Sequence, residues 1–179
     1  DRHGDASTVT VEMGRATFQP AALPCTLTTS ELIEQSIDVA GQLLTFTGVS
    51  VGNPHCVVFK PVGQSWSRED LLKLGPVLEH HALFPKRTNV QLARPTGPKE
   101  LFILIWERGA GETQASGSSS CAAASAAVRL GLVKSPVTVK MPGGQLNIQV
   151  AQDFSLTMKG PVAEVARGSL SPSFVRSLR

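Results

Sequence analysis

Short stretches of alternating or continuous apolar residues recur along the chain and predict a protein built mainly from β-strands. Residues 7–13 (STVTVEM) alternate and are rich in β-branched side chains, which is typical of a strand. Residues 101–107 (LFILIWE) are almost wholly apolar, so we expect a strand that is buried on both faces. Residues 15–24, interrupted by Pro20 and Pro24, are expected to form a loop. The other predicted strands are 43–51, 56–59, 89–93, 136–141, 145–150 and 156–159.

Two segments have the pattern of helices. Residues 67–82 begin with Ser67, a favourable N-cap, and carry acidic residues in the first turn, where the helix dipole favours them. Pro76 is expected to kink or split this helix. Residues 118–132 (SSSCAAASAAVRLGL) are dominated by alanine, which permits close packing on every side, and Gly131 marks the end. Many strands and two helices predict an α+β domain, with a β-barrel-like sheet wrapped around a central helix.

The composition fits a folded domain. The 179 residues are 41% hydrophobic and 17% charged, which suits one domain with a sizeable core and excludes a disordered chain. The net charge of +3 comes from scattered Lys and Arg residues, which disfavours nucleic-acid binding. It fits an ordinary basic surface, or attraction of an anionic small substrate. No apolar run could span a membrane, and no signal peptide is visible.

The cysteines indicate a reducing compartment. Cys25, Cys56 and Cys121 are odd in number and widely spaced, which argues against a disulfide framework, and we expect a cytoplasmic protein. No CxxC pair or histidine cluster suggests a metal site. The chain opens with Asp1 rather than Met, so we expect a segment of a longer protein.

The most informative stretch for chemistry is 106–123 (WERGAGETQASGSSSCAA). A buried strand is expected to end at Glu107 and Arg108, and a glycine-rich turn then leads into the alanine-rich helix. The first amides of a helix lack partners and carry partial positive charge, which suits a carboxylate or phosphate. Gly117 would let a ligand approach the backbone, and Ser118 and the serines after it add donors. A serine-rich N-cap on a core helix is an equally weighted alternative.

A second polar cluster is 52–56 (GNPHC), a turn between two predicted strands. The amide of Asn53 can donate and accept, so it suits either the amine or the carboxylate of an amino acid. Taken alone, His55 favours a structural role, and Cys56 favours the core.

A third cluster is 84–90 (FPKRTNV). Lys86 or Arg87 could pair with an acidic substrate, and Asn89 could bind a polar head group. The alternative is a solvated loop.

These three motifs in this order, followed by MPGG, a strand and MKGP, resemble the C-terminal half of the diaminopimelate epimerase family. The resemblance runs from about Val11 to the end of the chain. It implies two similar domains facing each other across a cleft, with no pyridoxal cofactor and no metal. A cysteine from each domain would face opposite sides of the substrate's α-carbon, one as base and one as acid. The domain expectation is therefore a strand and linker from a preceding domain (1–20), then the C-terminal domain (21–179), with the family's N-terminal domain absent.

The resemblance also assigns roles to residues. Gly117 and Ser118 would hold the α-carboxylate. Asn53 and Asn89 would hold or orient the distal end of the substrate. His55 would support the catalytic pair, and Glu107 would lie near the reacting centre. The catalytic set is completed by Ser116, which stands where the family has its second catalytic cysteine. The implied substrate-binding positions are Asn53, Asn89, Glu107, Arg108, Gly117 and Ser118.

The serine at position 116 is the main departure from the family. A serine hydroxyl is far less acidic than a thiol and needs an activating base, for which Glu107 or His55 could serve. Ser116 could donate a proton more readily than it could abstract one. Cys121 matches a second cysteine position of the family motif, so we expect it to pack rather than react.

The leading functional expectation is a cofactor-independent amino-acid epimerase that converts LL- to meso-diaminopimelate in lysine and peptidoglycan precursor synthesis. Its partners would be the amino-acid substrate and the missing N-terminal domain, with a homodimer left open. One alternative is a divergent member that uses Ser116 for one-base isomerisation, dehydration or racemisation of another amino acid. A second is a non-catalytic amino-acid-binding module. We expect the segment alone to be inactive, because it would hold half of a site.

Overall fold

The computed structural model describes residues 7–39 and 41–178. Residues 1–6 of the expected leading segment lie outside the described residues. The strands are β1 (Ser7–Arg15), β2 (Gln35–Val39), β3 (Gln42–Ser50), β4 (Pro54–Phe59), β5 (Asn89–Gly97), β6 (Glu100–Glu107), β7 (Gly111–Thr113), β8 (Val137–Met141), β9 (Gly144–Val150) and β10 (Ser155–Val162). The helices are α1 (Arg68–Glu79), α2 (Gly117–Arg129) and α3 (Pro172–Ser177), with a 3-10 turn at Pro20–Ala22.

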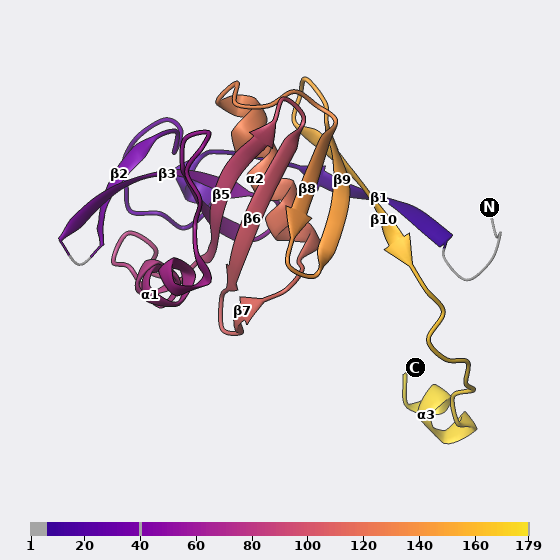
Figure 1. Cartoon of the computed structure of the whole chain (residues 1–179). Helices are drawn as coiled ribbons and strands as arrows, with labels where there is room; N and C mark the ends of the chain where they lie inside the picture. The colour runs from indigo at the N-terminus through magenta and orange to yellow at the C-terminus, as the bar shows by residue number, and fades with distance from the viewer. Residues whose placement is uncertain (1–6, 40, 179) are drawn as a thin grey trace.

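The strands form one curved sheet, in the order β1-β10-β9-β8-β6-β5-β4-β3-β2, with β7 paired to β6. Neighbours are antiparallel except for the parallel pairs β4–β5 and β6–β8. The chain after β1 returns to β3, where Thr17 N donates to Ser50 O at 2.9 Å and Ser50 N donates to Thr17 O at 2.8 Å. This contact closes the curve of the sheet around α2 (Figure 1). The predicted α+β fold with a barrel-like sheet around a helix is therefore confirmed.

Helix α2 lies in the middle of the core. All residues from Ser119 to Ala127 are buried, and the helix contacts β3, β4, β5, β6, β8, β9 and β10. Five of the buried positions are alanine (Ala122, Ala123, Ala124, Ala126 and Ala127), whose small side chains let strands approach on every side.

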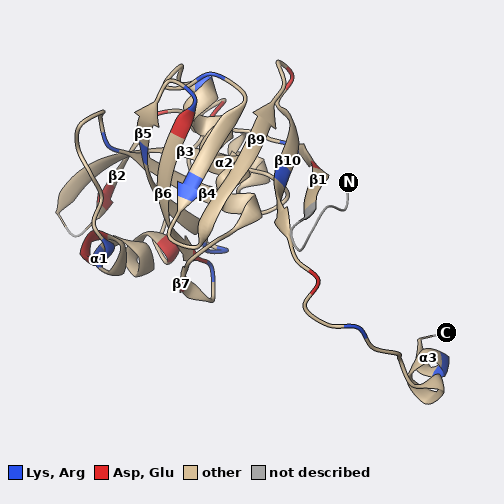
Figure 2. Ribbon diagram, turned by 45° about the vertical axis from the view of Figure 1, so that its right-hand side comes forward, with Lys and Arg blue, Asp and Glu red and all other residues tan. Residues whose placement is uncertain are grey.

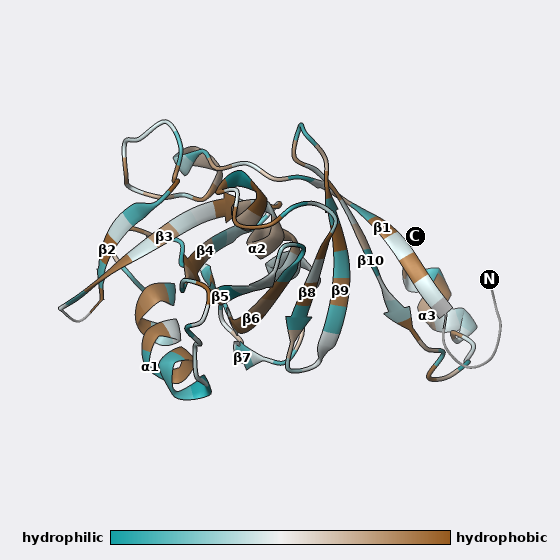
Figure 3. Ribbon diagram, turned by 45° about the horizontal axis from the view of Figure 1, so that its top comes forward, coloured by the Kyte–Doolittle hydropathy of each residue, from teal (hydrophilic) through white to brown (hydrophobic). Residues whose placement is uncertain are grey.

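Both faces of the sheet are buried at β6, whereas only one face is buried at β9. On β6, Ile103 and Ile105 pack in the cluster around α2, whereas Leu104 packs in the cluster under α1. This confirms the prediction of a strand buried on both faces. On β9, by contrast, buried Ile148 and Val150 alternate with exposed polar residues, an alternation that Figure 3 shows along the strand.

Helix α1 covers the outer face of the sheet near β5 and β6. Ser67 is its N-cap as predicted: Ser67 Oγ accepts from Asp70 N at 3.0 Å, and the Asp70 carboxylate accepts from Ser67 N at 2.8 Å. Pro76 does not split the helix, which continues to Glu79. The carbonyl that loses its partner to Pro76 belongs to Leu72, which lies on the solvent side, where water can satisfy it.

Strands β1 and β10 pair from Ser7↔Val162 to Arg15↔Ser155 and extend together away from the body, followed by the short helix α3 (Figure 1). Three short elements, β2, β7 and α3, were not predicted from the sequence. Charged residues of both signs are spread over the described ribbon (Figure 2). None of the helices between residues 7 and 178 is long and apolar enough to cross a membrane.

Candidate functional site

One end of the sheet brings the three polar motifs together. The parallel strands β4 and β5 both start there, with His55 opposite Asn89, and the antiparallel strand β6 ends there, with Trp106 opposite Val90. Helix α2 begins shortly afterwards at Gly117. The GNPHC turn, the FPKRTNV loop and the ERGAGET turn are therefore neighbours in space, although they span about a third of the chain.

The N-terminus of α2 is capped by Ser116. Its backbone is extended (φ −156°, ψ 127°), and its hydroxyl accepts from Ser119 N at 3.4 Å and lies 3.5 Å from Ser118 Oγ. The amides of Gly117 and Ser118 precede the first intrahelical hydrogen bond, and in the described part of the chain no acceptor contacts them. Two N–H groups at the positive end of the helix dipole are thus available to an anion.

A cavity of about 290 Å³ borders the start of the helix at Ser116 and Gly117. Its lining includes Ser116 and Gly117 from the helix start, together with Gly143 and Gly144 from the β8–β9 turn. Gly143 N donates to Gln114 O at 2.7 Å, and a Cβ at position 143 would lie 2.8 Å from that oxygen. Glycine is therefore required where the β8–β9 turn meets the segment between β7 and α2.

Asn89 joins the three motifs through its side chain, which is buried. Its Nδ2 donates to Pro54 O at 2.8 Å, and its Oδ1 accepts from Arg108 N at 3.0 Å. One amide group therefore fixes the position of the GNPHC turn relative to the Glu107–Arg108 turn.

His55 is fully buried, and its Nε2 lies 3.0 Å from Asn53 Oδ1. Burial lowers the pKa of His55 to about 3, the neighbouring Gln91 side chain opposes this shift, and the charge of Arg108 adds to it. The imidazole is therefore neutral at physiological pH. With the proton on Nε2 it donates to Asn53, so that the amide nitrogen of Asn53 remains available to a ligand.

Gln91 is a polar residue of this region that the motifs did not indicate. Its Nε2 donates to Ser119 Oγ at 3.0 Å, which links β5 to the first turn of α2. Within residues 7–39 and 41–178, His55 Nδ1 and Gln91 Oε1 are buried without a hydrogen-bond partner. A 180° rotation of the amide would let Gln91 donate toward His55 and accept from Ser119. The signal in the sequence was a glutamine between Val90 and Leu92 in an apolar strand.

Glu107 and Arg108 lie at the rim of this region. Glu107 is half-buried, and the described residues provide no hydrogen-bond partner for its carboxylate. Arg108 is exposed, and its Nη1 donates to Lys86 O at 3.2 Å. Neither Glu107 nor His55 is hydrogen-bonded to Ser116, whose contacts within the described segments are with its own helix. Among the described residues, no base is therefore hydrogen-bonded to the Ser116 hydroxyl.

Arg87, a predicted candidate for pairing with an acidic substrate, is exposed, and its Nη1 lies 3.3 Å from the buried carboxylate of Glu79. Cys56 and Cys121 are buried in the core, as predicted. Burial raises the pKa of Cys121 to about 12 and raises that of Cys56 further, so both thiols remain protonated.

The sequence model of the diaminopimelate epimerase family matches residues 47–165. Diaminopimelate epimerase 2 of Nostoc sp. is 43% identical over 92% of this chain and 56% of its own length. Diaminopimelate epimerase of Desulfitobacterium hafniense is 40% identical over 93% of this chain and 58% of its own length. The chain thus spans little more than half the length of these relatives.

A solved structure shares the fold at low sequence identity. A hydroxyproline epimerase from Agrobacterium vitis, with bound trans-4-hydroxy-L-proline, superposes with a TM-score of 0.56 at 14% identity, over 90% of this chain and 51% of that one. The family match and the relatives together cover all three polar motifs. The chain therefore belongs to the diaminopimelate epimerase family.

Proposed function

We propose that the whole protein is a cofactor-independent, cytoplasmic amino-acid epimerase that converts LL- to meso-diaminopimelate for lysine and peptidoglycan precursor synthesis. Residues 21–179 would form its C-terminal domain, and residues 1–20 would lead from a preceding domain. The names of the relatives support this proposal, as does the match over the motif region.

The observation that carries the proposal is the start of α2. The amides of Gly117 and Ser118 have no acceptor among the described residues, and Gly117 lines a cavity. A substrate α-carboxylate would accept hydrogen bonds from both amides. Removal of the α-proton leaves negative charge that spreads onto this carboxylate. Donors already in place stabilise that charge at little cost in reorganisation, which is the usual source of electrostatic catalysis.

The distal end of the substrate would meet the other polar groups. The amide nitrogen of Asn53 would donate to an acceptor on the substrate, and Glu107 and Arg108 would offer one charge of each sign. Asn89 would act by orienting its neighbours, because the protein already uses both ends of its amide. The opposite wall of the site would come from the preceding domain.

A second candidate follows from Ser116. Its hydroxyl caps the helix, and in the described residues no base is hydrogen-bonded to it. Such a hydroxyl would be a poor proton acceptor, so chemistry with one base, on the face opposite Ser116, is the alternative. This reaction would exchange the α-proton of one stereoisomer only.

Deuterium wash-in with the full-length protein separates these readings. LL- and meso-diaminopimelate are incubated in D2O with the wild type and with Ser116→Cys, and exchange at the α-carbon is followed by NMR. Cys121→Ser is the matched control, because it changes a cysteine of the same helix that lies in the core. For Ser116→Cys we expect exchange from both stereoisomers and a rate about 100-fold or more above the wild type, the usual contribution of a positioned acid or base.

The other outcomes have distinct meanings. Exchange from one stereoisomer in both proteins would establish the one-base reaction. Binding of diaminopimelate without exchange in either protein would indicate a binding module. Neither binding nor exchange would refute the proposed function.

A further inference from the structure

A buried carboxylate on α1 lies behind the turn that carries Glu107 and Arg108. Glu79 is only 3% exposed, and burial of a charge is costly unless it is hydrogen-bonded. Its Oε1 accepts from Gly109 N at 2.8 Å and lies 3.3 Å from Arg87 Nη1, and its Oε2 accepts from Trp106 Nε1 at 2.8 Å. The carboxylate is therefore fully enclosed by donors.

These donors come from two different loops of the candidate site. Trp106 and Gly109 flank the Glu107–Arg108 pair, so Glu79 holds that turn from both sides. Arg87 lies two residues before Asn89, and the backbone of this loop is also bound, since Thr88 N donates to Glu79 O at 3.3 Å. One residue outside the polar motifs thus holds both loops.

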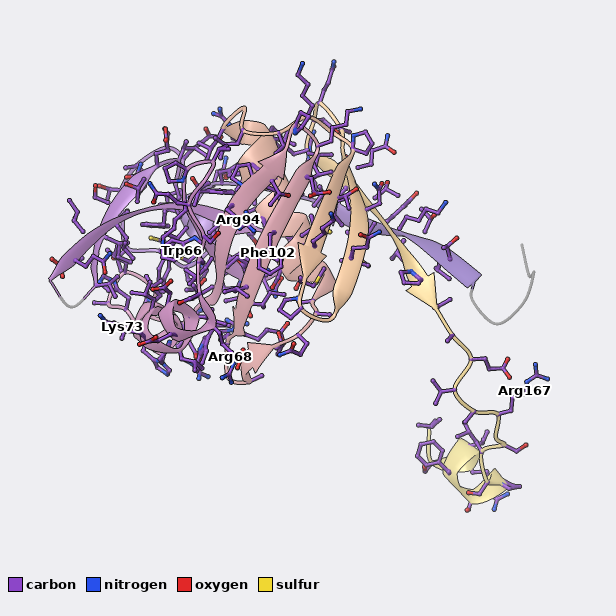
Figure 4. The ribbon with its side chains drawn as sticks, viewed as in Figure 1. Trp66, Arg68, Lys73, Arg94, Phe102 and Arg167 are labelled. Carbon is purple, nitrogen blue, oxygen red and sulfur yellow. The ribbon has the colours of Figure 1, made fainter. Side chains whose placement is uncertain are left out.

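Helix α1 is fitted closely to this turn. A Cβ at Gly75, one turn before Glu79, would lie 2.7 Å from the Trp106 ring, so glycine is needed for the helix to reach the strand. At the other end of the helix, Arg68 (Figure 4) donates to both carboxylate oxygens of Glu112 on β7, at distances of 2.7 to 3.0 Å. The helix is therefore attached to the β6–β7 hairpin at both of its ends.

We propose that Glu79 is a positioning residue of the site: its carboxylate fixes the Glu107–Arg108 turn against the Asn89 loop without contacting substrate. This inference rests on the proposed function for its effect on turnover, but the anchoring itself can be measured separately. Among the described residues, Glu79 is the acceptor for both Trp106 Nε1 and Gly109 N, and no other acceptor contacts either donor.

The first test is kinetic and uses the full-length protein with Glu79→Gln. Glutamine keeps the size of the side chain but offers one acceptor oxygen instead of two, so either Trp106 Nε1 or both Gly109 N and Arg87 Nη1 lose their acceptor. We expect KM for diaminopimelate to rise about 10- to 100-fold, the range for a lost hydrogen bond to a charged group, with a smaller change in kcat. Glu69→Gln, an exposed residue of the same helix, is the control and should leave both constants unchanged.

A purely structural role would give a different kinetic result. It would lower the folded fraction, and therefore the apparent kcat, without raising KM. That result would overturn the positioning role.

The second test does not depend on catalysis. Amide hydrogen exchange of the same proteins is followed by NMR, with the buried strand amide of Leu104 as the internal reference. A further variant, Glu79→Leu, removes both acceptor oxygens and should speed exchange at Gly109 and Arg108 about 10-fold or more, while Leu104 keeps its rate. Unchanged protection at Gly109 would overturn the proposal. If the wild type shows no turnover, the proposed function fails, and this measurement still decides whether Glu79 holds the turn.

Discussion

The side-chain nitrogen of Gln91 on β5 lies 3.0 Å from the hydroxyl of Ser119 in the first turn of α2, and both side chains are buried. Gln91 also neighbours His55, which contacts Asn53. A residue that belongs to none of the recognised motifs thus connects the GNPHC turn with the helix start. The position of the helix N-terminus depends on this buried contact as well as on packing.

Replacing Gln91 by leucine tests this connection. Gln91→Leu keeps a similar volume but leaves the buried Ser119 hydroxyl without its hydrogen-bond partner on β5, so we expect the free energy of unfolding to fall by about 1–3 kcal/mol. Urea denaturation of the wild type and the variant measures the change. Gln149→Leu, on the exposed side of β9, should change the free energy by less than about 0.5 kcal/mol. Equal effects of the two substitutions would show that the Gln91 contact is dispensable.

The buried His55 should make the free energy of unfolding depend on pH. Its pKa in the folded protein, about 3, lies below the ordinary value of 6.5, so the unfolded state binds the proton more tightly. The stabilisation is therefore complete above pH 6.5 and is lost as the pH falls from 6.5 toward 3. Between pH 7 and 5 this residue alone should remove about 2 kcal/mol from the free energy of unfolding.

The measurement is urea denaturation at pH 7 and pH 5. His55→Gln, which retains a donor for Asn53, should flatten the dependence, whereas His80→Gln, at an exposed position, should not. A His55→Gln variant with the same loss between the two pH values as the wild type would show that another group causes it.

The sequence indicated the core elements because their signals are local. The apolar run at 101–107, the alanine-rich helix and the Ser67 cap each depend on residues close together in the chain, and all three were found. The roles of Gln91 and Glu79 depend on strand register and on where α1 packs, which no local pattern specifies. For the same reason the sequence does not indicate that Arg87 pairs with Glu79.

Short elements were missed for a different physical reason. The strands β2 and β7 have five and three residues, too few to establish a period, and β7 exists because it pairs with β6. Helix α1 continues past Pro76 because its tertiary contacts outweigh the local preference of proline to end a helix.

Gly117 should be sensitive to a single added methyl group. A Cβ there would lie 3.0 Å from Met158 Sδ, so Gly117→Ala must move either Met158 or the first turn of the helix. We expect the affinity of the full-length protein for diaminopimelate to fall about 10-fold. Calorimetric titration measures this, with Gly168→Ala, where an added Cβ meets nothing within 4 Å, as the control. Adding Met158→Ala to Gly117→Ala should recover part of the affinity. Full affinity in Gly117→Ala would mean that this turn does not touch the ligand.

The helix start should also acidify a thiol placed on it. In Ser116→Cys the new sulfur occupies the N-cap position, where the helix dipole and the Ser119 amide favour the thiolate, so we expect its pKa to lie below 8.5. The pH dependence of alkylation by iodoacetamide measures this value in a Cys25→Ser background. Cys56 and Cys121 stay unreactive in that range because burial raises the pKa of each. A value of 8.5 or above would contradict an electrostatically active helix terminus.

The most direct test of the carboxylate site is an NMR titration of the ¹⁵N-labelled full-length protein with meso-diaminopimelate. We expect the amide resonances of Gly117 and Ser118 to shift and saturate with the ligand, and 1,5-diaminopentane, which has the amines without the carboxylates, to leave them unmoved. Diaminopimelate that shifts other resonances of the protein while those of Gly117 and Ser118 stay in place would contradict the proposed carboxylate site.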